Sequence, residues 1–318
     1  MSGSFKKINY SLRAAKHAER RMLCEVARRL AHFDNLDQYR YIGFGSVWFT
    51  DFVAFHKLLG IRDMVSIESS MTKDRFMSNR PFNIDILFGK SSEVLPKIKF
   101  DARSIVWLDY DERIDASKLA DTKYVVESVR SGSLIVISLQ CNEAAEIKSD
   151  DENDGTSPID RFTNAFTKGK VPPGLKEKDL IGWKFADVCM TMLQQEIDDA
   201  LVFRSRSEQK SYKFHRICQF NYADDAKMTS LVGIVVNEDE TGQYGRCEFD
   251  KLDFVSNGSD VVQIENPKLT ALEFKRLEAQ LPLAQGVQVD LAGGIPDREA
   301  REFIKHYRYY PSFAVLEH

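Results

Sequence analysis

Short apolar runs alternate with helix-like stretches between residues 39 and 142. The runs are rich in β-branched and aromatic side chains, a composition typical of strands. They are Tyr39–Phe44, Met64–Ile67, Ile84–Phe88, Ile105–Leu108 and Leu134–Leu139. Strands that are apolar throughout, with helices between them, predict a parallel sheet covered on both faces. Because crossovers between parallel strands are right-handed, the predicted fold is a doubly wound α/β domain.

The segments between these runs show helical spacing of apolar residues or helix-capping residues. A helix is predicted over Trp48–Leu59, and Gly60 ends it. Ser91 is the predicted N-cap of the next helix, and another helix is expected around Tyr124–Val129. Before the first strand, apolar positions in Ala14–Ala31 recur at helical spacing, which predicts a further helix.

That first helix carries a basic stripe. Arg13, Lys16 and Arg20 fall together on a face away from its apolar positions. Residues 1–32 hold eight Lys or Arg and two Glu, a surplus of six positive charges. A solvated helix face is one interpretation. A surface that binds an anionic acceptor is the other, and Arg75 and Arg80, after the second strand, would join it.

The second half of the chain predicts an addition to the sheet. The acidic stretch Glu143–Asp160 is expected to be an exposed loop, and a helix is expected around Phe185–Leu201. Two strands, His215–Tyr222 and Thr229–Val236, are joined by a polar segment. We expect them to form a hairpin that closes the far edge of the sheet with antiparallel pairing.

Two more helices are predicted near the C-terminal end. Thr270 and Glu273 form a capping box at the start of Thr270–Gln280, and Asp297–Tyr307 is a basic helix. The expected organisation is an N-terminal basic helix over residues 1–38, a Rossmann-like domain over 39–249 with an acidic insertion at about 143–211, and a helical appendage over 250–318.

Composition restricts the classes of protein that remain. The 318 residues include 44 Lys or Arg and 48 Asp or Glu, so a net charge of −4 gives no overall bias toward nucleic acid or membrane. No apolar stretch approaches the length of a membrane span, and no signal-peptide pattern is present. Five widely spaced cysteines without a CxxC pair favour reduced thiols. We therefore expect a cytoplasmic protein with no membrane partner.

The residues that follow each strand are the candidate ligand site, because open parallel sheets bind ligands at the carboxyl ends of their strands. Gly43 and Gly45 let backbone approach a ligand, and Glu68, 23 residues beyond Gly45, can accept two hydrogen bonds from a ribose diol. A dinucleotide motif would need a third glycine where this chain has Trp48. A nucleoside cofactor without phosphate therefore fits better.

These motifs resemble class I S-adenosylmethionine-dependent methyltransferases. The resemblance covers residues 39–142 and 212–237 and rests on four segments: Tyr41–Ser46, Ile67-Glu68, Phe88–Ser91 and Trp107–Asp111. It implies that Gly43, Gly45 and Ser46 hold the methionine half of the cofactor and that Glu68 binds the ribose. It also implies that Lys90 or Ser91 lies near the adenine and Asp109 near the sulphonium.

The resemblance also has departures. Tyr41 stands where an acidic residue is common, and Val47 replaces a small residue. No Asn/Asp-Pro-Pro-Tyr/Phe tetrapeptide follows the fourth strand, which disfavours methylation of amino groups on DNA bases. The metal-dependent branch carries an Asp-Asn pair where this chain has Cys141-Asn142, so no metal site is expected.

Methyl transfer requires alignment of the acceptor and removal of its proton. Asp109 and Asp111 are two apart, so one carboxylate can face the cofactor and the other can act as base. Arg13, Lys16, Arg20 and Tyr110 are the candidate acceptor-binding residues. The leading hypothesis is O-methyl transfer to a small or nucleotide-like anionic acceptor. The alternative is a catalytically degenerate binding or regulatory module, with nucleic acid as a less favoured partner.

Overall fold

The computed structural model describes residues 13–70, 72–148, 156–255 and 261–311. Eight strands form one sheet in the order β3-β2-β1-β4-β5-β7-β6-β8. Their bounds are β1 Arg40–Gly43, β2 Asp63–Glu68, β3 Asp85–Phe88, β4 Ser104–Asp109, β5 Ser133–Gln140, β6 Tyr212–Ala223, β7 Lys227–Asn237 and β8 Val261–Ile264. The first five strands are parallel, which confirms the doubly wound α/β fold predicted from the sequence.

The predicted hairpin is present, but it does not close the sheet. Strand β7 pairs antiparallel with both β5 and β6. Strand β8 then pairs parallel with β6 through Gln219–Tyr222, so β8 is the edge and the expected position of the hairpin at the edge was wrong. Four residues make too short an apolar run to stand out in the sequence, and long-range pairing alone makes them a strand.

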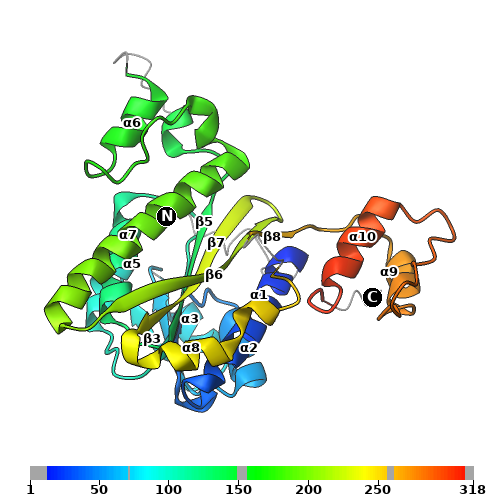
Figure 1. The fold of residues 1–318 in the computed structure, drawn as a ribbon, viewed down its shortest axis with the longest axis horizontal. Coiled ribbons are helices and arrows are strands. Elements are labelled where there is room, and N and C mark those ends of the chain that lie inside the picture. The colour runs from blue at the N-terminus through cyan, green and yellow to red at the C-terminus, as the bar shows by residue number, and fades with distance from the viewer. Residues whose placement is uncertain (1–12, 71, 149–155, 256–260, 312–318) are drawn as a thin grey trace.

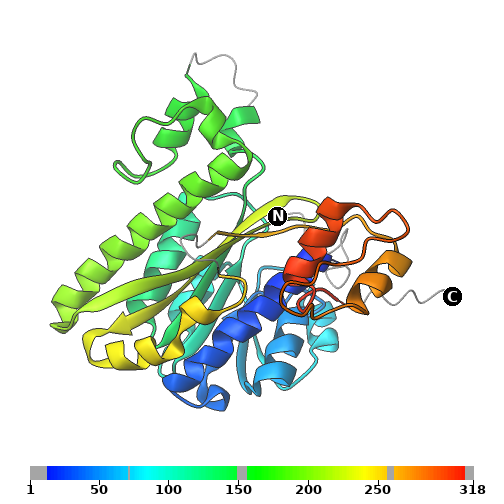
Figure 2. The same ribbon diagram turned by 45° about the vertical axis from the view of Figure 1, so that its right-hand side comes forward.

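Helices cover both faces of the sheet, as Figure 1 shows. The α-helices among the described residues are α1 Ala14–Arg29, α2 Thr50–Leu59, α3 Lys73–Asn79, α4 Ser91–Val94, α5 Ala116–Ser128, α6 Pro158–Asn164, α7 Gly182–Glu208, α8 Thr241–Cys247, α9 Ala271–Glu278 and α10 Asp297–His306. Figures 1 and 2 place α9 and α10 together on the α1 side of the molecule, away from α6. None of the described helices is long and apolar enough to cross a bilayer.

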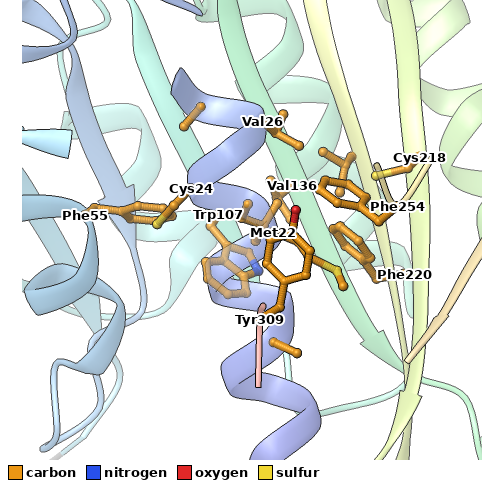
Figure 3. Close-up of a cluster of buried hydrophobic side chains, with 14 of the residues drawn as sticks. Met22, Cys24, Val26, Phe55, Trp107, Val136, Cys218, Phe220, Phe254 and Tyr309 are labelled. Carbon is orange, nitrogen blue, oxygen red and sulfur yellow. The ribbon is translucent and has the colours of Figure 1, made fainter. Parts of the chain in front are cut away.

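Two apolar cores lie on opposite faces of the sheet. One contains side chains from α1, α2 and the C-terminal helices, and Figure 3 shows Met22 of α1 beside Trp107 of β4 within it. The other contains side chains from α5 and α7 together with Val106 and Leu108 of the same strand. Successive β4 residues thus point to opposite faces, which is why an unbroken apolar run was the correct signal for this sheet.

Three local expectations need correction or completion. The segment predicted as a loop through Asp160 contains the start of α6, where the Ser157 side chain accepts a hydrogen bond from the Asp160 amide; residues 149–155 lie outside the described part. Ser91 is the first residue of α4 and not its N-cap, since its hydroxyl bonds to Asp121 instead. The Thr270/Glu273 capping box is confirmed. The expected domain boundaries stay predictions.

Candidate functional site

The carboxyl ends of β1, β2 and β4 bring the glycine loop and two carboxylates together. Gly43 at the end of β1 is in register with Ser66 of β2 and Trp107 of β4. Glu68 ends β2 and Asp109 ends β4, two residues beyond those partners. Gly43 and Asp109, which are 66 positions apart in the chain, therefore lie together with Glu68 at the carboxyl-terminal edge of the parallel strands, the crest of the sheet.

The loop between β1 and α2 is tightly built. The Gly45 amide donates to Glu68 Oε1 at 2.8 Å and to Ser66 Oγ at 3.1 Å. A Cβ atom on Gly45 would lie 2.4 Å from Cδ1 of Phe49 and 2.7 Å from Ser66 Oγ, so only glycine fits. Ser46 and Phe49 have φ values of 50° and 47°, a left-handed conformation that few side chains adopt. The hydrogen bond from the Gly45 amide to the Glu68 carboxyl thus fixes the loop to the end of β2.

Glu68 is buried without a counter-charge. Its exposed fraction is 6 %, and no Lys, Arg or His among the described residues lies within 4.0 Å of its carboxyl. Burial raises the pKa of Glu68 to about 7, against the opposing effect of hydrogen bonds from Ser66 and the Gly45 amide. A carboxylate desolvated in this way is costly in a fold and is a common mark of a functional site.

This raised pKa predicts a stability that depends on pH. The folded pKa of about 7 exceeds the ordinary value of 4.5, so the contribution of Glu68 is fully favourable below pH 4.5 and is lost as pH rises to about 7. We expect Glu68→Gln to raise the free energy of unfolding by about 2–3 kcal/mol at pH 8 and little at pH 4.5. Urea unfolding at both pH values measures this, with exposed Glu238→Gln as control. A difference that does not vary with pH would contradict it.

Asp109 is the most exposed member of a charged cluster that also contains buried Lys16 and Glu19. Its carboxylate is 18 % exposed and accepts from Lys16 Nζ at 2.7 Å. Lys16 also pairs with Glu19 at 2.8 Å, donates to the Tyr222 hydroxyl at 3.0 Å and lies 4.4 Å from the centre of the Trp107 ring. Burial lowers the pKa of Lys16, but the two carboxylates outweigh it and hold the pKa above its usual value. The lysine therefore stays charged.

Tyr110, Ser91 and Asp121 form a second polar group beside the crest. The Tyr110 hydroxyl donates to Asp121 Oδ2 at 2.8 Å, and the Ser91 hydroxyl donates to the same oxygen. The Tyr110 ring packs edge-on against Phe44 of the glycine loop at 5.2 Å. Lys90 next to Ser91 is exposed. The crest thus combines an aromatic wall with hydroxyl and ammonium groups from the β3–α4 turn.

The remaining predicted site residues are placed as follows. Asp111 is exposed just beyond the end of β4. Arg13 pairs with Asp225 at 2.9 Å, and buried Arg20 pairs with Asp51 of α2. These two arginines and Lys16 all face carboxylates of their own chain, so the structure does not present them as a free basic patch. Binding of an anionic acceptor by them stays a prediction.

Several partners of the predicted site residues could not be found from the sequence. Tyr222, 206 residues away, contacts Lys16 from β6, and Glu19 contacts it from the same helix, α1. Asp121 is the buried hydrogen-bond partner of two predicted residues, and no motif marks it. Glu19 had one signal, its i,i+3 spacing from Lys16. Within the described chain, no group of three or more metal-ligating side chains occurs.

A cavity of about 370 Å³ lies away from this crest, between α7 and β6. It is lined by Asp187, Met190, Thr191, Gln194, Gln195, Asp198, Arg216, Gln219 and Val261. None of the residues that carry the sequence motifs lines it. The chemistry of the crest, with its two carboxylates and glycine loop, is therefore a better guide to the functional site than the volume of this cavity.

Fold and site together define a class of protein. The order β3-β2-β1-β4-β5-β7-β6 with β7 antiparallel, and the glycine loop and acidic residue after the first two strands, are the arrangement of the class I methyltransferases. A sequence profile of the family described as "Putative O-methyltransferase" matches residues 8–318. The chain belongs to this family.

The solved structures that match this chain share little sequence with it. An O-methyltransferase from Bacillus cereus in complex with SAH is 12 % identical, covers 67 % of this chain and 80 % of its own, and gives a TM-score of 0.34. A chain of a fibrillarin/Nop5p complex is 11 % identical, covers 62 % and 73 %, and gives 0.35. Comparison with curated proteins gives no match. The fold assignment rests on the strand order instead.

Proposed function

We propose that this chain transfers the methyl group of S-adenosylmethionine to an oxygen atom of a small or nucleotide-like anionic acceptor. The observation that carries the proposal is the Glu68 carboxyl. It lies at the end of β2, bonded to the Gly45 amide and to no described cation. A buried carboxylate kept free of cations at this crest suits a ligand that supplies hydroxyl donors, and a ribose diol does so.

The donor set of the crest fits this cofactor. S-adenosylmethionine, when bound, supplies a methyl group on a cationic sulphur. Glu68 would accept hydrogen bonds from the ribose hydroxyls, and Gly43, Gly45 and Ser46 would line the methionine half. Asp109, whose carboxylate is partly exposed, would face the sulphonium. Lys90 and Ser91 would border the adenine, with Ser91 oriented by Asp121.

The loop above Glu68 covers most of this residue. Glu68 is only 6 % exposed, and its Oε1 accepts hydrogen bonds from the Gly45 amide and the Ser66 hydroxyl. A ribose would therefore reach the carboxyl when the Phe44–Phe49 loop shifts outward.

The acceptor would lie beside Tyr110 and the two aspartates after β4. O-methyl transfer breaks the sulphonium–methyl bond, forms an oxygen–methyl bond and releases the acceptor's hydroxyl proton. Asp111, exposed beyond Asp109, is the proposed base for that proton. Tyr110, held by Asp121, would form the wall of the acceptor pocket.

Methyl transfer from labelled S-adenosylmethionine tests this function. Purified protein is incubated with the cofactor and a panel of hydroxylated acceptors that includes catechols and nucleoside monophosphates. We expect label in an O-methyl product of an anionic acceptor and a rate about a hundredfold lower for Asp109→Asn. Label on nitrogen or carbon, or an Asp109→Asn rate equal to wild type, would contradict the proposal.

A catalytically degenerate binding module is the second candidate, and Tyr41 favours it. Its side chain is fully buried, and its hydroxyl would lie 2.6 Å from a Cβ atom on Gly43, so it fills space beneath the glycine loop. This candidate predicts salt-dependent binding of RNA or DNA without methyl transfer. Unchanged electrophoretic mobility with nucleic acid at low salt would exclude it.

The cytoplasmic location stays a prediction.

A further inference from the structure

The charged cluster beneath Asp109 has an unusual composition for a protein interior. Lys16 is 2 % exposed and lies between two carboxylates, Asp109 at 2.7 Å and Glu19 at 2.8 Å. Glu19 is fully buried and receives a hydrogen bond from Ser230. Buried ion clusters of this kind contribute less to stability than apolar side chains of similar volume. Their presence at the edge of a candidate site therefore points to a functional role.

Only one member of this cluster reaches the crest. Asp109 is 18 % exposed at the end of β4, while Lys16 and Glu19 are enclosed by the Trp107 ring, the Tyr222 hydroxyl and α1 itself. A ligand at the crest would contact the Asp109 carboxylate and would also experience the Lys16 charge behind it. In a poorly hydrated site this charge acts over several ångströms.

We propose that Lys16 is a positioning residue that fixes the Asp109 carboxylate and sets how strongly the site prefers the sulphonium cofactor over its demethylated product, whose sulphur is uncharged. This inference rests on the proposed function. S-adenosylmethionine and S-adenosylhomocysteine differ by a methyl group and one positive charge on sulphur. The ratio of their dissociation constants therefore reports the electrostatic potential at the sulphur. Lys16 offsets the negative charge of Asp109 and so keeps the two affinities close.

Calorimetric titration with both cofactors tests this without an identified acceptor. For the wild type we expect the two dissociation constants to agree within about threefold. Lys16 and Asp109 have opposite charges, and burial raises the pKa of Glu19, the other carboxyl group beside Lys16, which disfavours its charged form. Lys16→Met and Lys16→Gln remove the cation and should shift the ratio tenfold or more in favour of S-adenosylmethionine, because a unit charge within about 12 Å has at least this effect at an effective dielectric constant of about 20. Lys16→Arg should keep the wild-type ratio.

Lys170 provides a matched control. It too lies between two carboxylates, Glu196 and Asp199, each at 2.8 Å, but in the segment before α7. Lys170→Met should leave the ratio unchanged. Lys16→Gln keeps a hydrogen-bonding side chain, so it replaces Lys16→Met in the test if the methionine variant does not fold. The ratio of the wild-type protein is measured without any variant.

Two results would overturn the inference. One is a wild-type preference of more than about thirtyfold for the cationic cofactor. The other is an unchanged ratio in neutral variants whose thermal unfolding remains cooperative, whether or not both cofactors are weakened equally. These outcomes differ from a failure of the proposed function itself. In that case neither cofactor would bind the wild-type protein.

Discussion

Glu68→Gln should weaken the binding of S-adenosylmethionine by a hundredfold or more at pH 8. In the proposed complex the ionised carboxylate would accept hydrogen bonds from both ribose hydroxyls, and hydrogen bonds to a charged group contribute about 1.5–3 kcal/mol each. The amide of glutamine keeps the shape but offers a single oxygen acceptor and no charge. Calorimetric titration measures the loss, with exposed Glu238→Gln as the matched control.

The same variant separates binding from folding. Because burial raises the pKa of Glu68 to about 7, the ionised carboxylate opposes folding at pH 8. Glu68→Gln should therefore be more stable than wild type while it binds the cofactor less tightly. A variant that is both less stable and weaker in binding would indicate that Glu68 has only a structural role beneath the glycine loop.

Gly45→Ala should lower the free energy of unfolding by about 3 kcal/mol. The added Cβ would lie 2.4 Å from the ring of Phe49, which is fully buried, and 2.7 Å from the Ser66 hydroxyl, so neither neighbour can move aside easily. Gly245→Ala is the matched control, since a Cβ there meets no atom within 4 Å and alanine favours helix α8.

Urea unfolding of both alanine variants measures this effect. We expect Gly245→Ala to be as stable as wild type or slightly more stable. If Gly45→Ala were equally stable, the loop would be looser than its contacts indicate. The close fit of Gly45 would then no longer explain why glycine is required at this position.

The strand pattern of this chain was readable because each of its first five strands is apolar on both faces. Ile105–Leu108, for example, sends alternate side chains into two different cores, so the whole run is apolar. The position of Glu68 at the crest could be predicted because this residue directly follows the apolar run Met64–Ile67, and it is the last residue of β2 in the structure. These features depend on local sequence and on a general rule of parallel sheets.

The partners of the basic residues on α1 could not be predicted from the sequence in the same way. Lys16 and Arg20 lie on one side of a helix, which is equally compatible with solvent, a ligand or buried partners. Their carboxylate partners, Asp109 and Asp51, are 93 and 31 residues away, and only the packing of α1 brings them together. Strand β8 was missed for a related reason, since pairing with Gln219–Tyr222 defines it.

Titration of the wild-type chain with S-adenosylmethionine at pH 8, followed by calorimetry, tests the central claim most directly. We predict saturable binding at one site per chain with a dissociation constant in the micromolar range. No detectable heat at millimolar cofactor, confirmed by the absence of any thermal stabilisation, would contradict the assignment of this crest as a cofactor site.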